Sequence, residues 1–208
     1  VGSEMCIRDS PAWWAKFVEK HVDILAMNEE EGFAITGFED PLLAADKALD
    51  WVDLVICTAG EKGLFMAGHV DDSFKRETEY PLLPGAIADF NRYEFSRAMR
   101  KADCENPIRA YSHTAPFMGG PDSIKNTNGA GDCALAAVLH DLSANVYHKL
   151  NVANSAKHDQ QAITYSSLAQ ISKYANRASY EVLVQHSPRL SRGLPEREDC
   201  LEQVYWEQ

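Results

Sequence analysis

Short apolar runs alternate with segments of helical periodicity along the first third of the chain, and this pattern predicts an α/β fold. Residues 22–27 and 53–58 are apolar runs of strand length. Between them, residues 40–52 place apolar side chains at helical spacing after an Asp-Pro pair, which favours a helix start. The second run is apolar on both faces, which is typical of a parallel strand covered by helices. Residues 11–20 predict a further short amphipathic helix in front.

Later segments complete the predicted core. Residues 58–68 predict a strand, a glycine-bearing turn and a return strand. Residues 71–106 are polar and poorly periodic, so we expect an elaboration of the core that is too short to be a separate domain. Residues 108–112 predict a last strand, and residues 163–183 predict one or two helices with an apolar face. His113 is expected to lie in a loop without a catalytic role.

The main candidate for chemistry is the stretch at residues 125–132, which runs into an alanine-rich helical pattern. Gly129 and Gly131 allow the backbone to approach a ligand closely. The unpaired N–H groups and the positive dipole end of a helix favour an anion there, most simply a phosphate. Asp132, at the expected helix start, can accept a proton from an alcohol that attacks this phosphate. The alternative is structural: a glycine-rich helix start that is capped by Asp132.

Two further motifs directly follow predicted strands. Asn28 and Glu31 form an Asn-x-x-Glu motif after the first strand. Thr58, Gly60 and Gly63 form a Thr-x-Gly-x-x-Gly motif after the second strand. Each has a structural alternative, because a run of acidic residues complements the dipole at a helix start and glycines are common in hairpin turns.

In their order and spacing, the three motifs resemble those of the ribokinase-like (PfkB) carbohydrate and nucleoside kinases. The resemblance spans roughly residues 22–179. It implies a three-layer α/β/α fold with a mostly parallel central sheet. It also implies ATP and Mg²⁺ as cofactors, with transfer of the ATP γ-phosphoryl group to an alcohol.

The resemblance implies a role for each motif residue. Asp132 is the implied catalytic base. The implied anion hole for the transferring phosphoryl group consists of the backbone around Gly129, Ala130 and Gly131. The implied nucleotide-binding residues are Thr58, Gly60, Gly63 and Asn176, the last on a late helix beside the adenine. Asn28 and Glu31 are the implied magnesium residues, acting through water, since Mg²⁺ usually keeps several of its waters.

Two departures from the family pattern matter. Asn126 stands where the family usually has an Asp that is tied to a monovalent-cation site, so dependence on such a cation stays open. The family's substrate-binding residues and its Gly-Gly signature lie in an N-terminal half that has no counterpart here. We therefore expect residues 11–208 to be the C-terminal, nucleotide-side portion of a longer kinase domain. Residues 1–10 share no pattern with the rest of the chain and are expected to be a non-native leader.

Composition restricts the classes of partner. With 20 basic and 31 acidic residues the chain carries a net charge of −11, which argues against a nucleic-acid surface and against attraction to anionic lipid. The five cysteines include no Cys-x-x-Cys pair and indicate neither a zinc site nor a disulfide framework. This usage fits a reducing cytoplasm. No apolar run approaches the ~20 residues that cross a bilayer.

The predicted function is ATP-dependent phosphorylation of the 5′-hydroxyl of a purine nucleoside. Residues 126–141 and the loop-like tail at 187–199 are most similar to the bacterial branch of the family that phosphorylates inosine and guanosine. The expected partners are ATP and a small nucleoside or sugar, with no nucleic acid and no membrane; a homodimer is compatible with the sequence. Two alternatives stay open: a sugar kinase of the same family, and a nucleotide-binding domain without catalysis. The chain by itself is expected to be inactive.

Overall fold

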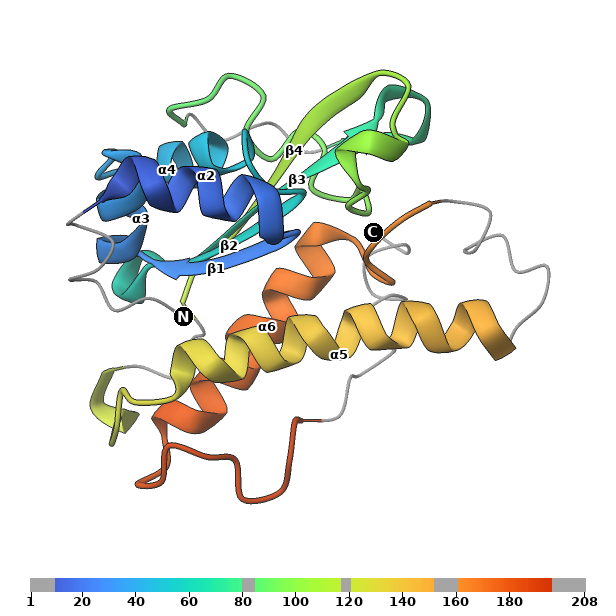
Figure 1. Cartoon of the computed structure of the whole chain (residues 1–208). Coiled ribbons are helices and arrows are strands. Elements are labelled where there is room, and N and C mark those ends of the chain that lie inside the picture. Colours follow the sequence, from blue (N-terminus) through green and yellow to red (C-terminus); the bar gives the residue numbers. More distant parts are fainter. Residues whose placement is uncertain (1–9, 80–84, 117–120, 152–160, 196–208) are drawn as a thin grey trace.

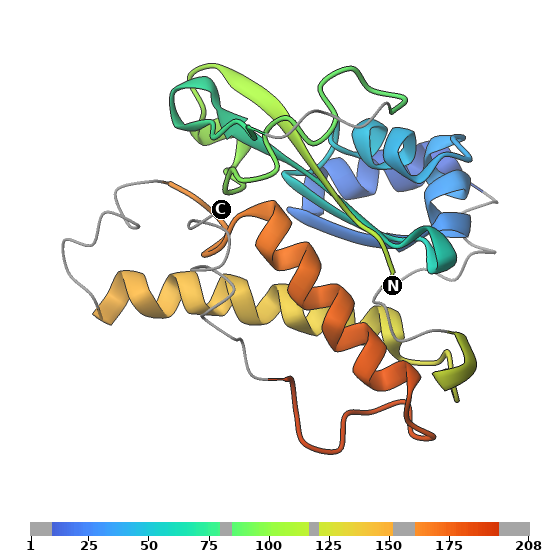
Figure 2. The ribbon, with the colours of Figure 1, turned by 180° about the vertical axis from the view of Figure 1, so that it is seen from behind.

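The computed structural model describes residues 10–79, 85–116, 121–151 and 161–195. In this part of the chain, helices cover both faces of one central sheet, as Figures 1 and 2 show. The strands are β1 (Ile24–Asn28), β2 (Leu54–Thr58), β3 (Leu64–Asp71) and β4 (Pro107–Thr114). The helices are α2 (Pro11–His21), α3 (Glu29–Thr36), α4 (Pro41–Ala48), α5 (Ala130–Asn151) and α6 (Leu168–Leu183). The predicted three-layer α/β/α arrangement is confirmed; the expected leader lies almost wholly outside the described residues.

The sheet has the order β1-β2-β3-β4. β1 pairs in parallel with β2, and α3 and α4 form the connection between them. The other two pairings, β2 with β3 and β3 with β4, are antiparallel. The described part of the sheet is therefore mixed, where we expected mostly parallel pairing. The reason lies in the β2–β3 connection, a single 3₁₀ turn at Gly60–Lys62 that is too short for the crossover a parallel pair needs.

β2 separates two hydrophobic cores, as its uninterrupted apolar pattern predicts. Leu54 and Ile56 point into the core that α5 and α6 cover. Val55 and Cys57 point into the opposite core, beneath α2 and α4. All four side chains are buried because successive residues of a strand face opposite sides of a sheet.

One local and one long-range set of contacts position α4. Asp40 caps α4, since its Oδ1 accepts hydrogen bonds from Leu42 N at 2.8 Å and Leu43 N at 3.0 Å. Arg109 of β4 donates from Nη1 to both the carbonyl and a carboxylate oxygen of Asp46, each at 2.7 Å. The contact between Arg109 and Asp46 ties α4 to β4, the last strand of the sheet.

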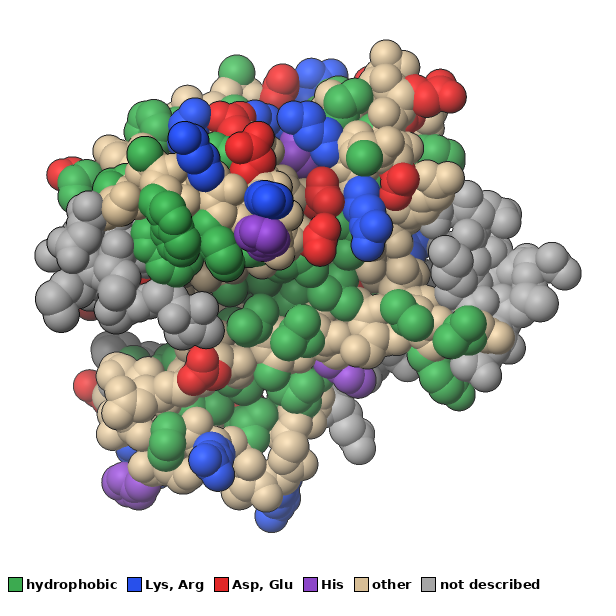
Figure 3. All heavy atoms as spheres, in the orientation of Figure 1, with side chains coloured by type: hydrophobic (Ala, Val, Ile, Leu, Met, Phe, Trp, Pro, Cys, Tyr) green, Lys and Arg blue, Asp and Glu red, His purple; other side chains and the backbone are tan. Residues whose placement is uncertain are grey.

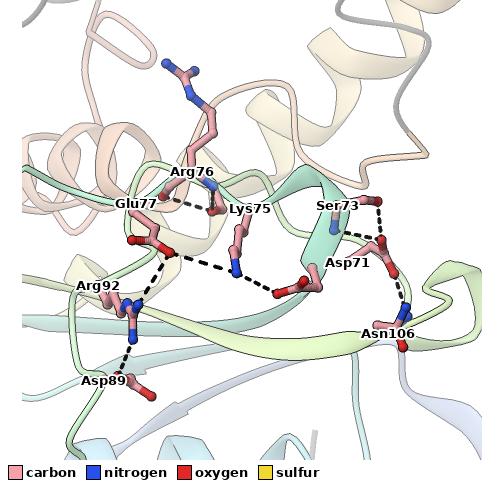
Figure 4. Close-up of polar contacts among 10 residues, drawn as sticks. Asp71, Ser73, Lys75, Arg76, Glu77, Asp89, Arg92 and Asn106 are labelled. Carbon is pink, nitrogen blue, oxygen red and sulfur yellow. Dashed lines mark hydrogen bonds and ion pairs between the residues drawn. The ribbon is translucent and has the colours of Figure 1, made fainter.

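The segment between β3 and β4 is an elaboration, as expected, and polar contacts hold its described parts. Asp71 accepts a hydrogen bond from Asn106 N at 2.7 Å, which joins the ends of β3 and β4 (Figure 4). Arg92 lies between Glu77, at 3.5 Å, and Asp89, at 3.2 Å. The buried apolar side chains of this segment belong to the two sheet cores and do not form a separate core. Phe90 lies in the core beneath α2 and α4, and the core beneath α5 and α6 contains Tyr93, Ala98 and Met99.

Among the described helices, none combines the length with the hydropathy that crossing a membrane requires.

Candidate functional site

The three motifs meet at one edge of the structure. Asn28 and Thr58 end the parallel strands β1 and β2 and stand opposite each other in the register. A Cβ built on Gly131 would lie 4.0 Å from the hydroxyl oxygen of Thr58, which places the first turn of α5 beside the end of β2. Figure 1 shows the start of α5 toward the same end of the molecule as α3. Ligands of open α/β sheets bind outside the carboxyl ends of the strands, and this is such a position.

Asn28 and Glu31 form a capping box at the start of α3. Asn28 Oδ1 accepts a hydrogen bond from Glu31 N at 2.8 Å, and Glu31 Oε2 accepts one from Asn28 N at 2.9 Å. The acidic first turn is thus a helix start, as the structural alternative proposed. The same bonds fix both side chains at the strand end. Only Oε2 of the Glu31 carboxylate takes part in the cap, so the donor set still fits a water-bound Mg²⁺.

The Thr-x-Gly-x-x-Gly turn is pressed against the end of β4. Gly63 has a φ of 93°, and a Cβ there would lie 2.1 Å from the carbonyl oxygen of Thr114. Gly60 has a φ of 47° in open surroundings. Both positions therefore favour glycine, the first also for lack of space. The ring of His113 reaches the Lys62 carbonyl oxygen through Nε2 at 2.7 Å. His113 lies in β4 and not in a loop, because the strand extends two residues beyond its apolar pattern.

α5 begins at Ala130, so Asp132 lies inside its first turn and does not cap it. The Cys133 N–H donates to the Gly129 carbonyl at 2.9 Å, which closes the first turn of the helix. The preceding N–H groups, at Ala130, Gly131 and Asp132, are the helix-start donors that point out of the helix. Asp132 is exposed beside them. An anion bound here has amide donors in front of it and a carboxylate at its side.

Gly129 has a structural requirement of its own. Its φ is 82°, and a Cβ would lie 2.3 Å from the Pro188 carbonyl oxygen. The turn before it is held by Asn126, whose Oδ1 accepts from Asn128 N at 3.0 Å and whose Nδ2 donates to the His186 carbonyl at 3.4 Å. The tail after α6 therefore supports the start of α5. The amide of Asn126 donates one of these hydrogen bonds, which an ionised carboxylate could not do because it has no N–H or O–H group.

Asn176 lies on α6, as the apolar periodicity predicts for that segment. Its Nδ2 donates to the Ala115 carbonyl oxygen at 2.7 Å, just after the end of β4. The amide thus joins α6 to the sheet, and its role beside an adenine stays a prediction.

Sequence reasoning missed an ion pair at the same edge. Lys62 Nζ lies 2.6 Å from Glu29 Oε1, which raises the pKa of Lys62. Burial, then the nearby Glu29 and Glu31 carboxylates, raise the pKa of the Cys57 thiol to about 12, while Lys62 opposes this. The edge thus combines carboxylates with a lysine that can face a polyphosphate. The signal in the sequence was the lysine at a variable position of the Thr-x-Gly-x-x-Gly motif.

No family model matches the chain. It is 66% identical over 207 residues to the guanosine-inosine kinase of Escherichia coli (strain K12), and this match covers 100% of the chain and 48% of the relative. The guanosine-inosine kinase of Escherichia coli O157:H7 gives the same figures, 66%, 100% and 48%. The chain spans about half the length of the curated relatives it matches.

Two solved structures share the fold. The adenosine kinase from Sinorhizobium meliloti superposes with a TM-score of 0.54 at 16% identity, over 100% of this chain and 43% of that one. A probable sugar kinase from Rhizobium etli CFN 42 gives a TM-score of 0.55 at 15% identity, over 98% and 42%. At such identities the likeness concerns the fold alone, and it confirms the predicted ribokinase-like fold class for the part that this chain spans.

Proposed function

We propose that this chain carries the nucleotide side of a kinase that transfers the γ-phosphoryl group of ATP to the 5′-hydroxyl of a purine nucleoside. One observation supports the proposal above the others: the Asn-x-x-Glu strand end, Thr58 and the first turn of α5 converge at one edge. In the sequence the three motifs are far apart. A capped helix or a hairpin turn alone would not require them to meet.

The chemistry follows from what each group can do at that edge. The N–H groups at the start of α5 bind the oxygens of the transferring phosphoryl group and stabilise the charge that develops on them. Asp132, exposed beside these donors, takes the proton of the attacking hydroxyl. Mg²⁺, when bound, neutralises phosphate charge. Asn28 and Glu31 would hold it through its water.

The acceptor is proposed from the relatives' names. The Escherichia coli relative is a guanosine-inosine kinase with 66% identity to this chain, so guanosine and inosine are the proposed substrates. A sugar acceptor is the second candidate, since a structure with this fold is described as a probable sugar kinase. We place the activity in the cytoplasm, where the free thiols of Cys57, Cys104 and Cys133 stay reduced. The dependence on a monovalent cation stays open at Asn126.

The role of Asp132 is tested in a chimera in which this chain replaces the matching stretch of the E. coli relative. Asp132→Asn is expected to lower kcat for guanosine about 1000-fold or more, because the amide cannot accept the proton, with nucleotide binding nearly unchanged. The measurement is coupled ADP release together with ATP binding by calorimetry. The matched control is Asp103→Asn, at an exposed aspartate in the 3₁₀ turn Lys101–Asp103, for which kcat should not change. Retained turnover in Asp132→Asn would exclude Asp132 as the base.

A further inference from the structure

Two side-chain hydrogen bonds join the end of α6 to the start of α5. Figures 1 and 2 show these two helix ends side by side. Ser179 of α6 donates from Oγ to the Ala130 carbonyl oxygen at 2.8 Å. In the opposite direction, Cys133 of α5 donates from Sγ to the Ala178 carbonyl oxygen at 3.2 Å. Both bonds involve the first turn of α5, whose N–H groups form the proposed anion hole.

Ser179 differs in its partner from two other helical serines of this chain. A serine inside a helix commonly donates to the carbonyl four residues earlier in the same helix. Ser143 of α5 does so to Leu139 at 2.8 Å, and Ser172 of α6 does so to Leu168 at 2.9 Å. The half-buried hydroxyl of Ser179 donates to the neighbouring helix instead. It therefore contributes to the placement of α5.

The bond to the Ala130 carbonyl also determines where an anion-hole donor points. The Ala130 carbonyl and the Gly131 N–H belong to one planar trans peptide, so they point in opposite directions. By holding the carbonyl, Ser179 fixes the direction of the Gly131 N–H. The Cys133 N–H, which donates to the Gly129 carbonyl at 2.9 Å, does the same for the Ala130 N–H. Both donors are thus aimed before an anion arrives.

The start of α5 needs such support because few side chains hold it. Gly129 has a φ of 82°, and Gly131 is exposed. Figure 3 shows mostly backbone and uncharged polar atoms at the surface around this end of α5. Glycine loses more conformational freedom than other residues when it is ordered. Donors that are already held avoid this cost when charge develops on a bound group. Ser179 should contribute more here than Cys133, because a thiol is a weak donor.

We infer that Ser179 is a positioning residue for phosphoryl transfer. Its hydroxyl holds the Ala130–Gly131 peptide so that the Gly131 N–H faces the transferring group. The end of α6 supports the preceding turn as well, since the N–H groups of Lys125 and Asn126 donate to the Leu183 carbonyl at 2.8 Å and 3.2 Å. The effect on catalysis rests on the proposed function, whereas the support of the helix start does not.

The first test measures amide hydrogen exchange in the 208-residue chain by mass spectrometry. In Ser179→Ala, peptides that cover residues 130–136 should exchange about fivefold faster, as expected for the loss of one ordinary hydrogen bond. Alanine is the best helix former, so α6 itself should persist. The matched control is Ser143→Ala, which removes a hydroxyl that bonds within α5 and should leave this exchange unchanged. Ser179→Thr keeps the hydroxyl and should restore slow exchange.

The second test measures kinetics in the chimera with the E. coli relative. Ser179→Ala should lower kcat for guanosine about tenfold, while KM for ATP and for guanosine changes less than about twofold, because the donor acts on charge that develops during transfer. Ser179→Thr should stay within about twofold of the parent kcat, and Ser143→Ala should equal it. A general loss of folded protein would not produce this separation of kcat from KM.

Three results would overturn the inference. Unchanged exchange over residues 130–136 in Ser179→Ala would show that the hydroxyl does not hold the helix start. A parental kcat in Ser179→Ala would show that this contact has no bearing on transfer. Equal losses of kcat in Ser179→Thr and Ser179→Ala would exclude the hydroxyl as the cause. A parent chimera without nucleoside turnover would instead contradict the proposed function, and the exchange measurement would still decide whether Ser179 holds the helix start.

Discussion

Gly63 and Gly37 both have a positive φ, but they differ in ψ, which is −147° at Gly63 and 4° at Gly37, and in their surroundings. Their φ values are 93° and 80°. A Cβ on Gly63 would lie 2.1 Å from the Thr114 carbonyl oxygen, whereas a Cβ on Gly37 would have nothing within 4 Å. At Gly37 glycine serves the left-handed end of α3 alone. At Gly63 it also lets the turn lie against β4, which keeps the motif at the site.

Alanine substitution is therefore expected to cost different amounts at the two positions. Gly37→Ala should lower the free energy of unfolding by about 1 kcal/mol, the strain of a left-handed alanine. Gly63→Ala should lower it by roughly 3 kcal/mol or more, because the overlap with the Thr114 carbonyl adds to the strain of a backbone conformation that is essentially restricted to glycine. Urea unfolding of the isolated chain measures both. Equal losses would show that the turn moves away from β4 at little cost.

The elements of the site differ in how much the sequence revealed of them. The start of α3 and the cap at Asp40 follow from local residue types, and the structure has both. The start of α5 was expected at Asp132 but lies two residues earlier, at Ala130. It depends on Gly129 approaching the Pro188 carbonyl, a contact between segments distant in sequence. The Lys62–Glu29 pair was missed for the same reason.

Asn28 serves the α3 cap and is also proposed to hold the water of Mg²⁺, and a pair of substitutions distinguishes these roles. In the chimera, Asn28→Ala should lower stability by about 1 kcal/mol and raise the Mg²⁺ concentration needed for half-maximal activity. Asn28→Ser keeps a good cap but removes the amide, so stability should stay within about 0.5 kcal/mol while the Mg²⁺ requirement still rises. Chemical unfolding measures the stability, and the rate of ADP release at increasing Mg²⁺ concentration measures the Mg²⁺ requirement.

The control for this pair is Ser167→Ala, which removes the cap at the start of α6, a helix whose opposite end contacts Lys125. It should lower stability by about 1 kcal/mol and leave the Mg²⁺ requirement unchanged. An unchanged Mg²⁺ requirement in Asn28→Ser would show that Asn28 caps α3 and does not hold the water of Mg²⁺.

At the scale of the whole molecule, the sequence predicted the layers better than the pairing of strands. The uninterrupted apolar run of β2 predicts that both of its faces are buried, because each face packs against its own core. The direction of β3 and β4 depends on the short connection at Gly60–Lys62 and on register along the whole strands. Neither is a property of one segment, so the mixed sheet could not be derived from apolar patterning.

The layered molecule also predicts what the isolated chain can do. It brings the strand ends, the glycine turn and the first turn of α5 together at one edge, and Asp132 is exposed there. We therefore expect the 208-residue chain to bind ATP but to show no nucleoside-dependent ADP release, because Asp132 is exposed within the described residues and an acceptor hydroxyl beside it would not be held in position. The chimera with the E. coli relative should release ADP with guanosine and inosine.

The assay uses a panel of guanosine, inosine, adenosine and ribose with coupled detection of ADP. Circular dichroism verifies that both proteins are folded. Turnover by the isolated chain with any nucleoside would show that both sides of the site lie within these residues. Turnover by the chimera with ribose alone would favour the sugar acceptor. A folded chimera that binds ATP and turns over nothing would favour a nucleotide-binding domain, because groups aligned for binding do not transfer phosphate without a base in reach of the acceptor.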